Sequence, residues 1–75
     1  MPRFFFETSI DDSEVGDEEG LDYPDLAAAR RDAGRSLRPL VAEAMGRGGR
    51  SCAVTVRGES GTVVARFSAS LAKEP

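Results

Sequence analysis

The change from strand to helix lies within Asp17–Arg31, DEEGLDYPDLAAARR. Four acidic residues occupy the first six positions, and Pro24 and Asp25 then directly precede an alanine-rich run. An aspartate just before a helical pattern is a favourable N-cap, because its carboxylate accepts hydrogen bonds from the free amides of the first turn. Its negative charge also suits the positive end of the helix dipole. The stretch therefore predicts a helix that begins directly after Asp25.

The predicted helix carries one apolar stripe at steps of three and four residues, as amphipathic helices do. Its members are Leu26, Ala29, Ala33, Leu37, Leu40, Val41 and Ala44. We expect the helix to end at Gly46. Gly34 weakens it, and Pro39 removes a hydrogen bond at a cost of about 3 kcal/mol. We therefore predict a kink near residues 35–38, or two shorter helices.

The segments on both sides of this helix have the composition of strands. Residues 3–8, RFFFET, are aromatic, and alternation places Phe4, Phe6 and Thr8 on one face. A short second strand is expected within residues 9–20 or at residues 21–23, forming a hairpin with the first. Residues 51–57 and 62–67 predict a second hairpin around the turn at residues 58–61. In it, Val63, Ala65 and Phe67 are expected to share a face.

These elements predict an α+β fold in the order β-β-α-β-β, with one helix on one face of a small antiparallel sheet. Residues 1–75 form a single domain, in which residues 68–75 are expected to be a frayed tail, although Leu71 could still tuck against the sheet. The face without a helix would carry Phe5 and Val64. An exposed phenylalanine there favours a partner, so we expect self-association through this face, with Phe5 and Val64 as its candidate residues, or through a sheet edge.

Length and composition bound the function. A chain of 75 residues has a thin core, and such chains usually need a disulfide, a metal or a partner subunit. One cysteine, Cys52, allows no intrachain disulfide, and the absence of histidine disfavours an ordinary zinc site. We therefore expect a homodimer with no cofactor, and Cys52 as a small buried side chain. An unidentified protein partner is a further possibility.

No stretch approaches the roughly 20 apolar residues needed to span a bilayer, so no membrane partner is expected. The start, MPRFFFETS, is too short in apolar residues for a signal-peptide core, which indicates a cytoplasmic protein.

The acidic segment could instead suggest a metal site. Its best match to a calcium loop begins at Asp11 and places Gly16 in the sixth position. However, Val15 offers no ligand in the fifth position, and Asp22 replaces the glutamate of the twelfth. We interpret the segment as a solvated hairpin. A metal-dependent hydrolase using Asp11, Asp17 and Glu19 is the weakest hypothesis, and we expect no enzymatic activity.

Basic residues give the alternative function. The net charge of −3 divides into −8 for residues 1–26 and +5 for residues 27–75. Candidate phosphate contacts follow the helix and the next loop: Arg31, Arg35, Arg38, Arg47 and Arg50. Nucleic-acid binding is disfavoured by the net charge, the single lysine and the lack of interleaved aromatics, but it stays open.

The start Pro2-Arg3-Phe4-Phe5-Phe6, the acidic loop, and the helix entry Pro24-Asp25-Leu26 resemble a family of short bacterial proteins. Members of this domain of unknown function typically begin Pro-Arg-Tyr/Phe-Phe-Phe, and the resemblance covers nearly the whole chain. It implies the order of elements given above and no activity. Residues 3–45 also show a looser likeness, in topology alone, to HicB-type antitoxins. The main hypothesis is thus a non-enzymatic, self-associating protein-interaction module. The alternative is an antitoxin-like or nucleic-acid-associated regulator.

Overall fold

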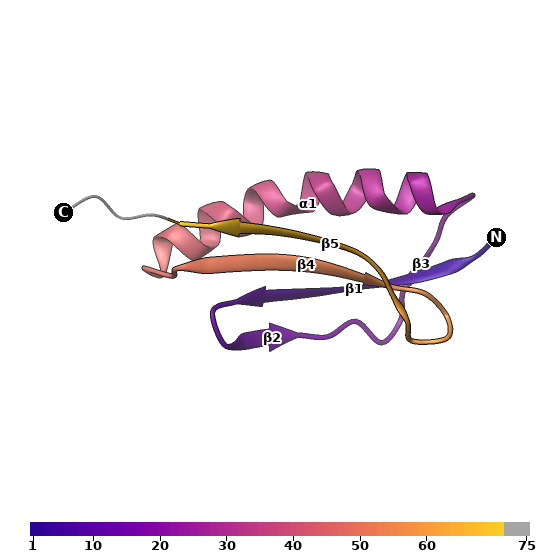
Figure 1. Cartoon of the computed structure of the whole chain (residues 1–75), viewed down its shortest axis with the longest axis horizontal. Helices are drawn as coiled ribbons and strands as arrows, with labels where there is room; N and C mark the ends of the chain where they lie inside the picture. The colour runs from indigo at the N-terminus through magenta and orange to yellow at the C-terminus, as the bar shows by residue number, and fades with distance from the viewer. Residues whose placement is uncertain (72–75) are drawn as a thin grey trace.

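The computed structural model describes residues 1–71 and shows one helix lying along one face of a five-stranded antiparallel sheet (Figure 1). The elements are β1 (Arg3–Ile10), β2 (Ser13–Val15), β3 (Leu21–Asp22), α1 (Leu26–Gly46), β4 (Ser51–Arg57) and β5 (Val63–Ser70). The strand order is β2-β1-β4-β5, and β3 also pairs with β1. The predicted α+β class and element order are confirmed, and both proposed places for an extra strand are occupied.

The helix begins as predicted. The Asp25 carboxylate accepts a hydrogen bond from the Ala28 amide at 2.8 Å, and α1 continues to Gly46. It runs unbroken through Gly34 and Pro39, so the alternative of two shorter helices is wrong. Figure 1 shows the axis bending in its second half, which brings the end of the helix toward the start of β4. A proline in a helix interior produces such a bend.

The core is thin and lies between α1 and the sheet. One cluster consists of Phe4, Tyr23, Ala29, Ala33, Val54 and Val56, and a second of Ile10, Ala44 and Cys52. Three alanines are thus the buried residues of the helix, and they allow it to lie close to the strands. The predicted inward face of the first strand is confirmed, since Phe4 is 7% exposed and Phe6 packs against the first cluster.

The last strand is longer than predicted. β5 extends to Ser70, and Ser68 and Ser70 pair with Ala53 and Ser51 of β4. The amide of Leu71 donates to the Arg50 carbonyl at 2.7 Å. The prediction of a frayed tail is therefore wrong for residues 68–71, because the ladder with β4 continues there. Residues 72–75 lie outside the described part of the chain.

A β-bulge overturns one side-chain assignment in β5. Val56 pairs with Ala65 while Arg57 pairs with Val63, so Val64 is the extra residue. The bulge moves Val63 out of step with Ala65 and Phe67, and its side chain is 46% exposed. The expectation that Val63 shares their face is wrong for this reason. Within residues 1–71, no helix combines the length and apolarity needed to cross a membrane.

Candidate functional site

Asp17 is the best-connected acidic residue of the loop, and its partners are backbone amides. Its Oδ2 accepts from the Phe6 amide at 3.0 Å, and its Oδ1 accepts from the amides of Glu19 and Gly20 at 3.1 and 3.0 Å. These hydrogen bonds lower the pKa of the Asp17 carboxyl, with the Gly20 amide as the largest cause and the Phe6 amide next. The carboxylate thus takes the place of a strand partner for Phe6.

The position of Asp17 follows from a gap in the sheet. β2 pairs with the end of β1, at residues 8–10, and β3 pairs with its start, at Arg3 and Phe4. Between them the Phe6 amide has no strand opposite, and a buried backbone amide without a partner is costly. Asp17 lies in the chain between β2 and β3 and supplies the missing acceptor.

Gly20 closes the same loop. Its φ of +71° favours glycine, and a Cβ atom there would lie 2.8 Å from the Phe4 carbonyl oxygen and 2.9 Å from the Phe5 ring. The Phe5 ring therefore lies against Gly20, which leaves Phe5 half-buried.

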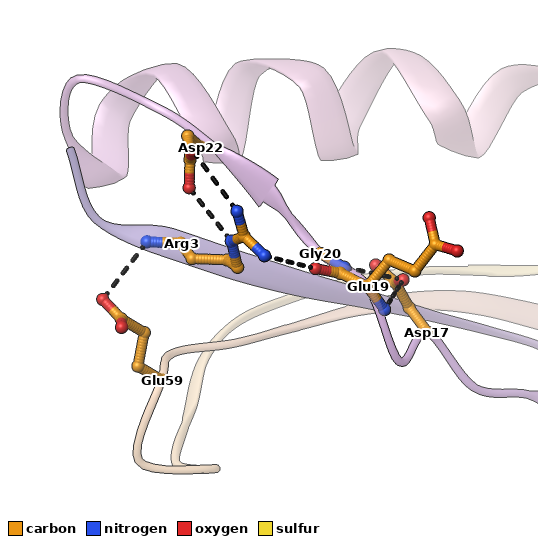
Figure 2. A network of polar contacts seen from close by, with 6 residues as sticks. All are labelled: Arg3, Asp17, Glu19, Gly20, Asp22 and Glu59. Atoms are coloured by element: carbon orange, nitrogen blue, oxygen red, sulfur yellow. Dashed lines mark hydrogen bonds and ion pairs between the residues drawn. The ribbon is translucent and has the colours of Figure 1, made fainter.

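Arg3 connects the start of β1 to the acidic loop, to β3 and to the turn between β4 and β5, as Figure 2 shows. Its Nε donates to Asp22 Oδ1 at 3.1 Å, its Nη1 donates to the Glu19 carbonyl, and its backbone amide donates to Glu59. The guanidinium lowers the pKa of the Asp22 carboxyl, chiefly through this hydrogen bond. The acidic segment before the helix, residues 17–22, is thus held in place by the Arg3 side chain and by backbone amides.

Asp11 likewise accepts hydrogen bonds from backbone amides, at the other end of β1. It adopts φ 52°, and its Oδ1 accepts from the amides of Arg50 and Ser51 at 2.8 and 3.1 Å. Asp11 and Asp17 are therefore committed to two different turns. Among residues 1–71, no group of three His, Cys, Asp or Glu side chains is placed to hold a metal ion.

The sheet face opposite α1 is mainly polar. The Arg57 Nε donates to Glu7 Oε1, and a shallow cavity of about 220 Å³ there is lined chiefly by polar side chains of β1, β4 and β5. Of the predicted self-association residues, Phe5 is half-buried against Gly20, and Val64 is 36% exposed in the bulge. The structure thus leaves Val64 accessible and shields much of Phe5.

The predicted arginines divide into two groups. Arg31, Arg35 and Arg38, here called the arginine face, surround Gly34 on the exposed side of α1 and line one shallow depression. Arg47 and Arg50 lie beyond the end of the helix. Arg47 forms an ion pair with Glu43 at 2.7 Å, and Arg50 lies beside Asp11 and Asp12. The sequence predicted one set of phosphate contacts, whereas the structure brings together the first three.

Sequence reasoning allowed association through a sheet edge but did not identify the outer edge of β5. An eight-residue strand forms that edge of the sheet, and its only charged residue is Arg66. The signal was present: Ala65, Phe67, Ala69 and Leu71 continue the two-residue alternation beyond the predicted strand end, and all four pack against the core clusters. Cys52 is 2% exposed, which confirms its prediction as a buried side chain.

Comparisons with known proteins identify a family but no function. Residues 3–70 match the model of a family described as "Domain of unknown function (DUF6894)". No curated protein and no solved structure matches the chain. The family match does not show the looser likeness to HicB-type antitoxins. Since the match covers all the strands and the helix, the chain belongs to the DUF6894 family.

Proposed function

We propose that this protein is a non-enzymatic, cytoplasmic interaction module that self-associates by antiparallel pairing of two β5 edges. The observation that carries the proposal is the free side of β5. Among residues 1–71, β5 pairs with β4 on one side, and no described group forms a hydrogen bond with the backbone on its other side. A long edge strand with few charges is a template for adding another strand.

The register shows which backbone groups point outward. In an antiparallel pair, N–H and C=O groups of alternate residues point to the same neighbour. Because Leu71 donates to Arg50, the backbone groups of residues 65, 67 and 69 face β4. Those of Arg66, Ser68 and Ser70 then face outward, where a second strand could bond them.

A twofold axis at Phe67 gives the most favourable pairing with a second copy. It places Phe67 opposite Phe67 of the other copy, in the narrow pairing where aromatic side chains approach closely. Ala65 then lies opposite Ala69, and Arg66 opposite Ser68. An axis at Arg66 would instead oppose two like charges, which is destabilising.

The thin core favours a second copy of the chain as the partner that pairs with the β5 edge. Val54 and Val56 are the largest fully buried side chains, and α1 contributes alanines. Small domains often gain stability by association, and closed twofold dimers are the commonest form. Edges that must stay single usually carry lysine or proline, and Val63–Ser70 has neither.

Two substitutions of matched size test the pairing and its register. In the proposed dimer each Ser68 lies opposite Arg66 of the other copy, so Ser68→Lys opposes like charges twice and Ser68→Glu opposes opposite charges twice. We expect the wild type to approach twice its monomer mass of 8.0 kDa in sedimentation equilibrium as its concentration rises. Ser68→Lys should shift the transition to higher concentration, and Ser68→Glu should not.

Further variants separate this edge from the opposite sheet face. Ser68→Pro removes only an outward amide, which an edge strand tolerates, and should give a folded monomer. Phe5→Ala should leave the dimer intact, because Phe5 lies away from β5. A wild type that stays at monomer mass up to about 1 mM would refute self-association. A dimer with a dissociation constant above this concentration would be held by less than about 4 kcal/mol. Loss of the dimer in Phe5→Ala alone would move the interface to the sheet face.

A further inference from the structure

We infer that the arginine face of α1, formed by Arg31, Arg35 and Arg38, binds the phosphate backbone of duplex DNA. The three side chains lie within eight residues, and the seven steps from Arg31 to Arg38 extend about 10 Å along the helix axis. Gly34 lies in their midst, and at the position of its missing Cβ nothing approaches within 4 Å. The result is a shallow depression with guanidinium groups around it.

The positive charge of this face is largely uncompensated. Within residues 1–71, Arg31 and Arg38 form no ion pair. Arg35 lies 3.8 Å from Asp32, and the two side chains are 76% and 48% exposed. Such an exposed pair contributes little. Arg3, Arg47 and Arg57, by contrast, each have a carboxylate in direct contact.

The acidic residues that give the chain its net charge lie elsewhere. Glu14, Glu18 and Glu19 belong to β2 and the segment leading to β3. Figure 1 shows β2 on the side of the sheet farthest from α1. A polyanion on the arginine face would therefore approach the positive side of a dipolar molecule.

The residue types favour phosphate, and duplex over single strands. Guanidinium groups bind phosphate oxygens through two parallel N–H donors. Proteins that bind single strands add aromatic side chains on which bases stack. α1 carries no aromatic residue, so it offers guanidinium contacts to phosphate groups and no surface on which bases could stack. The binding should therefore be independent of sequence.

Salt dependence gives the expected size of the effect. Three phosphate contacts give a slope of log affinity against log salt near −2.7, or about a 40-fold loss between 50 and 200 mM salt. If the protein also pairs through β5, the twofold axis places both arginine faces on the same side of the joined sheet. Six contacts would then approximately double the slope.

The test is titration of the full chain into a labelled 20-base-pair DNA duplex at several salt concentrations, followed by fluorescence anisotropy. For each arginine face that binds, Arg35→Gln with Arg38→Gln should reduce the slope by about 1.8, and for a single face it should reduce the affinity at 50 mM salt about 200-fold. The matched control, Arg47→Gln with Arg50→Gln, removes the same charge at the other end of α1 and should leave both nearly unchanged. Circular dichroism checks that both variants fold.

Three results would overturn the inference. One is an equal loss in the two double variants, which would indicate a general charge effect. Another is equal or tighter binding of a single strand of the same length. The third is equally tight binding of a polyglutamate peptide, which would indicate an acidic protein partner. The Ser68→Lys variant separates a failure of β5 pairing from a failure of DNA binding. Loss of the dimer in this variant should halve the slope, while the arginine face still binds DNA.

Discussion

Among the carboxylates of the acidic loop, Asp17 should be the one whose replacement by alanine destabilises the protein most. The substitution leaves the part-buried Phe6 amide without an acceptor, which costs about 1–3 kcal/mol. The Glu19 amide is exposed, where water can replace the carboxylate, and the Gly20 amide is part-buried, so these two hydrogen bonds together add about 1 kcal/mol. We expect a total loss of about 2–4 kcal/mol.

That loss is large for so small a domain. A chain of this length is stable by about 4–11 kcal/mol, on the usual scale per residue. Each kcal/mol lowers the melting temperature of a 75-residue domain by about 6 °C, so Asp17→Ala should melt about 12–24 °C below the wild type. Thermal unfolding followed by circular dichroism at neutral pH measures this difference.

Asparagine should not rescue the position. Both carboxylate oxygens of Asp17 accept hydrogen bonds, so either orientation of an amide group would turn an N–H toward an N–H. The control is Glu18→Ala, which removes the same charge from an exposed neighbour whose side chain forms no hydrogen bond or ion pair among residues 1–71. If Asp17→Ala melted within 2 °C of this control, the assigned role of the carboxylate would be wrong.

The pH dependence has a definite sign. The folded protein lowers the pKa of Asp17 from its ordinary value of 3.8. The carboxylate therefore contributes fully above that value, and its contribution is lost as the pH falls through the lower folded pKa. The gap in melting temperature between wild type and Asp17→Asn should shrink as the pH falls from about 6 to about 3. A constant gap over this range would contradict the assignment.

Three further changes test the local structure. Gly20→Ala should lower the free energy of unfolding by more than about 2 kcal/mol, since φ is +71° and a Cβ would meet the backbone of β1. Gly34→Ala, on the exposed side of the helix, should raise it by about 0.5–1 kcal/mol, and urea unfolding measures both changes. Burial, then the hydrogen bond to Asp32, raises the pKa of Tyr23 to about 12, so absorbance of this single tyrosine should titrate near there. Stability from this group should be complete below pH 10 and be lost as the pH rises through 12; titration near 10 in folded protein would contradict it. Asp25→Ala should cost about 1 kcal/mol by removing the N-cap, and no change in melting would refute that role.

The amino-acid sequence by itself determined the features that depend on neighbours along the chain. Asp25 could be recognised as the N-cap because capping involves residues three positions apart. The end of the helix at Gly46 and the inward side of β1 followed from periods of 3.6 and 2 residues. The element order followed from these local patterns together with the two hairpins.

The tertiary structure decided what depends on residues far apart in the chain. Asp17 accepts the hydrogen bond of the Phe6 amide because neither β2 nor β3 pairs with the middle of β1. No local sequence pattern predicts this gap in the pairing. The bulge that exposes Val63 depends on how β5 pairs with β4. The separation of Arg50 from the arginine face depends on Asp11 and Asp12, which lie about 40 residues earlier in the chain, directly after β1. Hydrogen-bond partners and ion pairs between distant segments form only when the strands are placed side by side, so their roles become visible only in the folded chain.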